Sequence, residues 1–369
     1  MNPINLAQDI YTHEEVMRML VRDREVRYEF IIRNQYNQTI GSLSNATGSI
    51  SFDSTREIMR TCSITAKRSE LLQISSVDYR IVPYFCILAP NGHWLRYPLG
   101  IFIINPAAVL NNKEVEITVD GYDLAQIAYD AKLEDVAAYA EGAVYTSSIS
   151  NRIGALYTNY DVVANPSLTN PAAVEYEIGT EEITVINDML DAINYYPLYF
   201  DENGAAHAEP YIFPEERTVE LEYSADNKSV IFDGVSQASN LFSIPNKFIR
   251  YTDDPDHESL RSVVTVTDPS IPSSTVNRGR VITDIQAVKD VATQTTLNNL
   301  TRRAAITASQ HTETLEFSTV NMPGHGFKTC LQFRCEDIGI DAKYIETAWE
   351  MELSPGGKMT HKCDRAVTI

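Results

Sequence analysis

The sequence predicts a mainly β fold with α+β parts, organised as two β-barrel domains plus a small α/β insert domain. Two observations predict this class. Segments rich in Val, Ile, Tyr, Phe and Thr, with stretches that alternate every second residue, fill residues 1–125 and return in residues 223–369. Between them, residues 126–222 combine helical periodicity with short strand signals. We therefore expect a first barrel at 1–125, the insert at 126–222 and a second barrel at 223–369.

The first block carries strand and turn signals in close succession. The Asn91–Gly92 pair predicts a tight hairpin turn, because glycine accepts a positive φ without steric cost. The continuously apolar run at 97–104, YPLGIFII, predicts a strand buried on both faces. In EVEITVDGYDL, at 114–124, apolar and polar residues alternate, which predicts the next barrel strand with one face in water. The residues expected to face inward are Val115, Ile117 and Val119. A helix is expected to follow, with Asp123 as its N-cap.

The insert is expected to be a compact unit of helices and a small hairpin. Apolar residues at helical spacing predict a helix that ends before Pro197. Its apolar stripe consists of Ile183, Ile186, Leu190 and Ile193. A hairpin around Asn203–Gly204 should follow this helix.

The third block is expected to place strands around one long helix at about 283–310. Thr283 or Asp284 would begin this helix, and Arg302 and Arg303 lie near its end, where positive charge is favourable for the helix dipole. This block and the first are both rich in strand signals, which is compatible with two related barrels.

Composition limits the class of protein. With 369 residues, 44% hydrophobic and 22% charged, the chain is long enough for two or three folded domains. Residues 1–20 contain acidic side chains and no apolar run, so we expect no signal peptide, and no apolar stretch reaches the roughly 18 residues of a membrane helix. The chain should therefore be made and kept soluble in a cytoplasm unless a larger assembly carries it out.

Five cysteines are an odd count, which argues against a disulfide framework and predicts reduced, mostly buried thiols.

The net charge of −20 is concentrated in the middle of the chain. From Glu134 to Glu222 there are 17 acidic residues against Arg152 and Arg217. This segment should repel nucleic-acid phosphate, and an acidic solubilising surface is its simplest interpretation.

The histidines and cysteines near the C-terminus are candidate metal ligands. These are His325, Cys330, Cys335, His361 and Cys363. Their spacings match none of the usual zinc motifs, and Cys330 and Cys335 should point to opposite faces of a strand. We therefore assign no metal or cofactor.

Catalytic signals are equally weak. Adjacent acidic pairs occur at Glu181–Glu182, Glu215–Glu216 and Asp253–Asp254, but neighbours on one element do not converge on a substrate. The common nucleophile, metalloprotease and nucleotide-binding motifs do not occur in the sequence. His93 and His325 each lie in a turn sequence, and both are expected at hairpin tips. No catalytic residue is assigned.

Five stretches carry a resemblance to a known family. HWLRYPLGIFIINP followed by VEITVDGYDL resembles the first domain of tail hub proteins from tailed bacteriophages and related phage-like particles. YYPLYFDENGAAH is similar to their small α/β domain. AAITASQHTETLEFSTVNMPGHGF and IGIDAKYIETAWEMELSPGGKMTHKCDR resemble their last domain. Six glycines in these motifs are the structural turn positions that we single out: Gly100, Gly121, Gly324, Gly326, Gly356 and Gly357.

The resemblance implies a structural, non-enzymatic role at the tail tip of a virion. Hubs of this type carry two tail-tube-like barrels per chain, so a homotrimer presents a pseudo-sixfold ring. The expected partners are the tail tube or a distal tail ring protein above and a spike or fibre protein below. DNA would pass through the channel without specific binding, and assembly would take place in the host cytoplasm.

Two alternatives remain open on the sequence. One is a hydrolase of cell-wall peptidoglycan or glycan, which requires convergent carboxylates. The other is a host-surface carbohydrate-binding module, in which Trp94, Trp349 and the 20 tyrosines would form an exposed aromatic platform.

Overall fold

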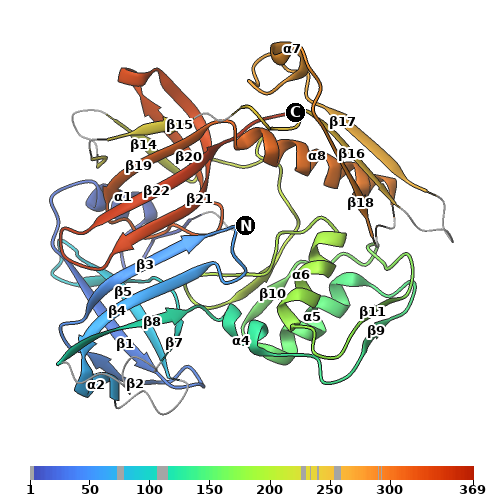
Figure 1. Ribbon diagram of the computed structural model, residues 1–369. Coiled ribbons are helices and arrows are strands. Elements are labelled where there is room, and N and C mark those ends of the chain that lie inside the picture. The colour runs from blue at the N-terminus through green and yellow to red at the C-terminus, as the bar shows by residue number, and fades with distance from the viewer. Residues whose placement is uncertain are drawn as a thin grey trace.

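The computed structural model describes residues 4–72, 79–105, 115–225, 230–232, 234–238, 241–252, 259–289, 291 and 293–369. Strands dominate these ranges, which confirms the mainly β class with α+β parts. In Figure 1 the strands of the first and third blocks lie side by side, the insert lies below and to their right, and a helix on a small sheet lies above the insert. None of the described helices is long and apolar enough to cross a membrane.

Eight described strands of the first block and six that belong to the third form one 14-stranded sheet. The first block contributes β1 (Val26–Arg33), β2 (Thr39–Leu43), β3 (Thr47–Asp53), β4 (Arg60–Lys67), β5 (Arg80–Leu88), β6 (Trp94–Pro98), β7 (Phe102–Ile104) and β8 (Glu116–Tyr122). The third block contributes β14 (Leu221–Ser224), β15 (Ser236–Ala238), β19 (Thr314–Val320), β20 (Cys330–Cys335), β21 (Ile340–Glu352) and β22 (Lys358–Arg365). Its main path runs β15-β19-β22-β21-β3-β4-β8-β7-β5-β1-β2, and among the described residues this path does not close into a barrel.

Strand β21 joins the two blocks. It spans 13 residues, or about 43 Å when extended. Along one edge it pairs with β22, and along the other its first half pairs with β20 and its second half with β3. The two strand-rich blocks are therefore continuous through hydrogen bonds of a single strand.

Two details of the first block differ from the sequence prediction. The apolar run at 97–104 is buried but is not one strand, because the chain leaves β6 at Pro98, turns at Gly100 with φ +135° and resumes in β7. Strand β8 pairs with β7 and buries Ile117 and Val119 as expected, but Val115 lies before the strand and is 80% exposed. The predicted hairpin at Asn91–Gly92 is confirmed between β5 and β6.

Two helices accompany the first block: α1 (His13–Leu20) and α2 (Arg68–Leu72). Thr12 caps α1 by accepting a hydrogen bond from the Glu15 backbone, and the Glu15 carboxylate accepts one from the Thr12 backbone. Val16 and Leu20 of α1 are buried in the core of the large sheet, so the capped helix covers apolar strand residues.

The insert is an α/β unit, as expected. Its elements are α4 (Ala125–Asp130), β9 (Ala137–Tyr139), α5 (Tyr145–Leu156), β10 (Tyr160–Val162), β11 (Val174–Tyr176), α6 (Glu182–Ala192), β12 (Tyr199–Phe200) and β13 (Ala206–Ala208). The predicted stripe of α6 is buried in a core that also includes Val82 and Ile101 of the first block, and β12 and β13 form the predicted hairpin around Gly204. Helix α4 begins two residues after Asp123, whose carboxylate still accepts a hydrogen bond from the Ala125 backbone.

The predicted helix at 283–310 is wrong in its first third. Residues 283–288 form β18 (Thr283–Val288), which pairs in parallel with β16 (Lys247–Thr252), and β16 also pairs with β17 (Arg261–Thr265). The helix is α8 (Gln294–Gln310), and its cap is Thr293, whose hydroxyl accepts a hydrogen bond from the Thr296 backbone.

Helix α8 packs on this three-stranded sheet, which Figure 1 shows apart from the large one. The short helices α7 (Thr275–Arg278) and η1 (Glu336–Ile338) complete the third block. The domain boundaries near 125 and 222 stay a prediction.

Candidate functional site

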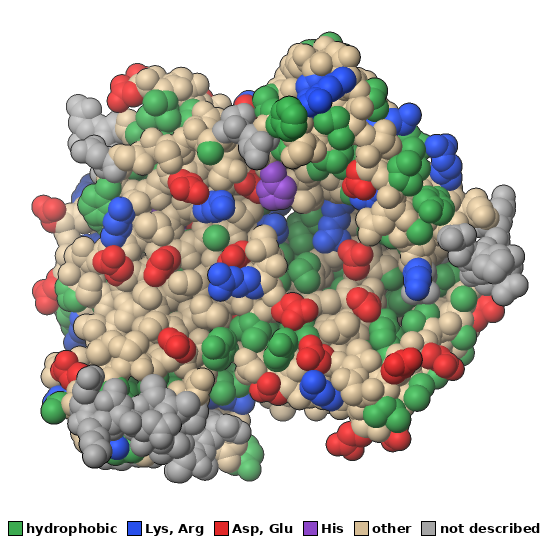
Figure 2. All heavy atoms as spheres, viewed as in Figure 1, with side chains coloured by type: hydrophobic (Ala, Val, Ile, Leu, Met, Phe, Trp, Pro, Cys, Tyr) green, Lys and Arg blue, Asp and Glu red, His purple; other side chains and the backbone are tan. Residues whose placement is uncertain are grey.

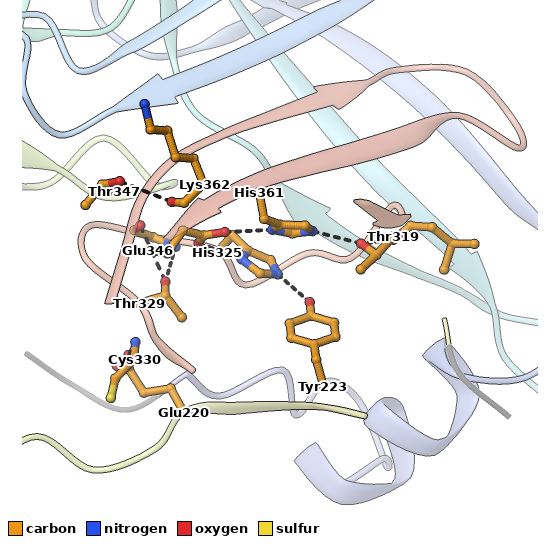
Figure 3. Close-up of polar contacts among 12 residues, drawn as sticks. Glu220, Tyr223, Thr319, His325, Thr329, Cys330, Glu346, Thr347, His361 and Lys362 are labelled. Carbon is orange, nitrogen blue, oxygen red and sulfur yellow. Dashed lines mark hydrogen bonds and ion pairs between the residues drawn. The ribbon is translucent and has the colours of Figure 1, made fainter. Parts of the chain in front are cut away.

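Two histidines and a glutamate meet in the interior of the third block (Figure 3). His325 comes from the loop between β19 and β20, Glu346 from β21 and His361 from β22. All three side chains are between 0 and 1% exposed. The loop that carries His325 therefore folds inward, and the prediction that His325 lies at a hairpin tip is wrong.

A β-bulge in β21 helps to place the glutamate. The register of β21 against β22 shifts between Glu346 and Ala348, so Thr347 is an extra residue in the ladder. As a result, four consecutive residues at 344–347 are buried and the alternation of the strand is interrupted. A bulge of this kind redirects side chains, here around the position of Glu346.

The glutamate bridges the two histidines. One carboxylate oxygen, Oε2, lies 2.7 Å from Nδ1 of His325, and the other, Oε1, lies 2.7 Å from Nδ1 of His361. The second ring nitrogens also have partners. Nε2 of His325 is 2.8 Å from the Tyr223 hydroxyl, and Nε2 of His361 is 2.9 Å from the Thr319 hydroxyl. Figure 3 shows these contacts as one continuous chain of hydrogen bonds.

The protonation pattern follows from burial and from these partners. Burial raises the pKa of Tyr223 well above its ordinary value, so its hydroxyl stays neutral beside Nε2 of His325. Burial also lowers the pKa of His361, and only part of this effect is offset by Glu346. Burial alone would raise the pKa of Glu346, but the charge and hydrogen bonds of His325 and His361 outweigh it and lower the pKa. The cluster thus holds an ionised glutamate between two Nδ1–H donors.

This arrangement suits a structural role better than a metal site. The nitrogen and oxygen atoms lie within 4.8 Å of one another, a spacing compatible with an ion. However, each ring nitrogen and each carboxylate oxygen already has a hydrogen-bond partner, so no free set of lone pairs converges on one point. The network instead ties β14, β19, β21, β22 and the 321–329 loop together.

A second histidine cluster lies in the insert. Asp161 on β10, His207 on β13 and Glu209 have ligand atoms within 4.8 Å of one another. His207 stacks on Tyr199 and its Nε2 lies 3.4 Å from Asp201. Burial lowers the pKa of His207, but Asp201 and the neighbouring acids raise it above its ordinary value overall. These carboxylates therefore favour the protonated form of His207.

Comparison with solved structures relates this architecture to known proteins. The tail protein from Neisseria meningitidis MC58 superposes with a TM-score of 0.65 at 12% identity, covering 92% of this chain and 97% of that chain. The 43 kDa tail protein of prophage MuSo2 from Shewanella oneidensis gives a TM-score of 0.59 at 10% identity, covering 92% and 98%. Prophage tail protein gp18 from Listeria monocytogenes EGD-e gives 0.52 at 12% identity, covering 90% and 94%.

The chain has the fold of phage tail proteins. Because the match spans nearly all of each of these chains, it covers the large sheet, the insert and the α8 unit together. The resemblance to tail hub proteins is thereby confirmed at the level of the fold. No protein-family model and no curated protein sequence matches this chain.

Two of the predicted glycines lie in the first half of this tail-protein fold. Gly100 lies between β6 and β7, where its φ of +135° is a conformation that other residues rarely adopt. Gly121 lies inside β8 rather than at its end, and an added Cβ would come 2.7 Å from Sγ of Cys62 and 2.8 Å from Cδ1 of Ile104. The backbone at Gly121 is therefore tightly packed against its neighbours.

The other four predicted glycines lie in two loops of the second half. Gly324 and Gly326 flank His325, and Gly324 has φ +94°, whereas an added Cβ at Gly326 would meet nothing within 4 Å. Gly356 and Gly357 form the turn between β21 and β22, where a Cβ on Gly357 would lie against backbone oxygens. The six glycines lie in four separate stretches of the chain, one of them inside β8.

Most of the cysteines and acidic residues that were candidates for chemistry are buried or form ion pairs within the fold. All five cysteines are buried and free, as predicted, and the described metal-type clusters contain no cysteine. In the acidic pairs, Glu182 binds Arg152 at 2.6 Å and Glu215 binds Arg302. The pair at 253–254 lies outside the described residues.

The tryptophans do not form an exposed platform. Trp349 is only 5% exposed, and Arg27 covers the Trp94 ring at 4.1 Å. Sequence reasoning paired His325 and His361 with cysteines and missed Glu346, their common partner. The available signal was an acidic residue inside the largely apolar stretch YIETAW.

Proposed function

We propose that this protein is a structural, non-enzymatic hub of a phage-like tail tip. In this proposal three chains form a pseudo-sixfold ring that joins the tail tube or a distal tail ring protein to a spike or fibre protein. The ring leaves a channel for DNA, and the protein resides in the virion after assembly in the host cytoplasm. The fold of phage tail proteins over almost the whole chain supports this role.

The pairing of β21 carries the proposal. Because β21 pairs with β20 of one strand-rich half and with β3 of the other, the two halves keep a fixed relative orientation. We interpret each half as one tail-tube-like barrel unit, which neighbouring chains complete in the assembly. Three chains would then present six such units, which is the symmetry match that a hub between a sixfold tube and a threefold spike requires.

The ends of the sheet path support a ring contact. In the described residues, the path ends at β2 on one side and β15 on the other. Every residue of β2 except Leu43 is exposed, and so are all three residues of β15. Exposed edge strands offer unpaired backbone groups to another chain, so a head-to-tail contact from β2 to β15 would propagate around a ring.

The net charge of −20 gives little support to the DNA channel. It repels phosphate, but 17 of the acidic residues lie from Glu134 to Glu222, in the insert and not in the halves that we propose form the ring. The hydrolase alternative has less support, because the central histidine–glutamate cluster is saturated by its own hydrogen bonds and closed to solvent.

An edge-directed variant tests the ring. Purified protein at increasing concentration should reach a mass of three times 41.4 kDa by light scattering. Ile40→Lys places a charge on exposed β2 and should prevent this association, whereas Val281→Lys, at an exposed site outside the strands, should not. A trimer that is equally stable in Ile40→Lys would exclude the β2 contact, and a monomer at every concentration would argue against a ring formed by this chain alone.

A further inference from the structure

A cavity of about 180 Å³ lies where the large sheet, the insert and α8 meet. It is lined by the turn after β3, two stretches of the insert at 196–197 and 211–217, α8, the loop between β19 and β20, and strands β21 and β22. Figure 2 shows a hollow in the middle of this face, in which Lys or Arg side chains are visible. This cavity is separate from the histidine–glutamate cluster, since it shares none of that cluster's three residues.

Lys328 is an unusual residue at this cavity. Its backbone has φ +54°, a left-handed conformation that is uncommon for a non-glycine residue. Its ammonium group forms no hydrogen bond or ion pair with any part of the chain that the structure describes. Burial lowers the pKa of Lys328 to about 8, with Asp364 opposing and Arg303 and Arg217 reinforcing the shift. The fold thus holds a half-buried ammonium group without a counter-ion at bonding distance.

Two further cations line the same cavity. Arg303 on α8 donates to the Tyr195 carbonyl at 2.9 Å, and its nearest carboxylate, Asp191, is 67% exposed and 3.5 Å away. Arg217 is paired with Glu220 at 3.2 Å. The cavity's own acid, Asp364, is engaged by His311 at 2.7 Å. Positive charge therefore exceeds negative charge around the cavity.

A buried hydroxyl on the cavity wall points to the same kind of ligand. Ser54 is 9% exposed and lines the cavity, and its Oγ is buried without a hydrogen-bond partner among the described residues. Buried hydroxyls are almost always hydrogen-bonded, so a hydroxyl without a partner on the wall of the cavity that Lys328 also lines suggests that a bound group serves both.

We propose that this cavity binds a small oxyanion through Lys328 and Arg303, with the Ser54 hydroxyl as an additional donor. The shared chemistry is that of phosphate and carboxylate, which accept charge-assisted hydrogen bonds from ammonium and guanidinium groups. A volume of about 180 Å³ is below that of typical pockets for drug-sized ligands, which start at about 300 Å³, so the occupant is a small ion or a single side-chain group. Its source is either free phosphate or a carboxylate group.

Thermal unfolding and calorimetric titration with inorganic phosphate test the proposal, at ionic strength held constant with chloride. Phosphate should stabilise the wild-type protein in a saturable way. Lys328→Met should weaken binding about tenfold to a hundredfold, and Ser54→Ala should weaken it less. Lys358→Met, which removes an exposed lysine elsewhere, is the matched control and should bind as the wild type does.

Two further measurements separate loss of binding from loss of folding and identify the anion. Without phosphate, Lys328→Met and Ser54→Ala should unfold at or above the wild-type temperature, because the first removes an unpaired charge and the second an unpaired hydroxyl. A parallel titration with acetate separates the sources: saturable binding of acetate that also needs Lys328 indicates a carboxylate site, and binding of phosphate alone indicates a phosphate site. No saturable response to either anion, or the same response in Lys328→Met and wild type, would overturn the proposal.

Discussion

Replacing Glu346 by Gln probes the buried histidine–glutamate cluster most directly. The carboxylate is 0% exposed and accepts two hydrogen bonds of 2.7 Å from imidazole Nδ1–H groups. A glutamine of the same shape offers one acceptor and one donor group. One imidazole therefore keeps its bond, and the other must move its proton to Nε2.

The magnitude follows from the bond that is lost. A hydrogen bond to a charged group contributes about 1.5–3 kcal/mol, so Glu346→Gln should lower the free energy of unfolding by about 2 kcal/mol. Glu346→Ala leaves two buried donors without acceptors and opens a cavity, so it should cost about 4–6 kcal/mol. Either value is a large part of the roughly 5–15 kcal/mol that stabilises a typical domain.

The assay is urea unfolding combined with hydrogen exchange of the 321–329 loop. Glu350→Gln is the control, because it makes the same change at an exposed position of the same strand and should alter stability by less than about 0.5 kcal/mol. In Glu346→Gln, amide exchange in the loop should accelerate, since His325 loses part of its anchor. If Glu346→Gln matches Glu350→Gln in both measurements, the cluster does not hold the loop and the reasoning fails.

Further predictions concern pH, backbone crowding and the thiols. The pKa of His361 lies below its ordinary 6.5 and that of Glu346 below its ordinary 4.5, so in both cases the unfolded chain takes up protons first. His207 and His311, whose pKa values are raised, change stability in the direction opposite to His361, so the carboxylate gives the clearer test. In urea titrations the loss of stability below about pH 4.5 should be smaller in Glu346→Gln than in the wild type, and an equal loss would count against an ionised Glu346. Gly121→Ala should cost about 1–3 kcal/mol through overpacking, whereas Gly326→Ala should be neutral within about 0.5 kcal/mol, and equal unfolding midpoints would refute this distinction. Burial raises the pKa of Cys86 to about 11, and all five cysteines are buried, so a thiol reagent should label the native protein far more slowly than the urea-unfolded protein; rapid native labelling would contradict this.

Local patterns predicted the elements whose periodicity was long and clear. The alternation of β8 gave the inward positions of Ile117 and Val119, and the apolar stripe of α6 gave its buried face. The hydrophobic periodicity did not predict β18 at 283–288. This segment is short and mixes polar and apolar residues without a clear period, and it is a strand because it pairs in parallel with β16.

The histidine–glutamate cluster could not be predicted because it depends on a β-bulge and on an inward-folded loop. Neither feature has a sequence signature of its own: the bulge follows from the register of β21 against β22, and the loop is fixed by contacts that His325 makes across the fold. The joining of the two blocks through β21 is likewise a tertiary pairing, which no local pattern encodes.

Electron microscopy of the assembled protein tests the hub proposal most directly. The proposal predicts rings of three chains with six-lobed density around an open channel, in which the β2 edge of one chain meets the β15 edge of the next. Particles of another stoichiometry, or three-chain particles without a channel, would contradict it.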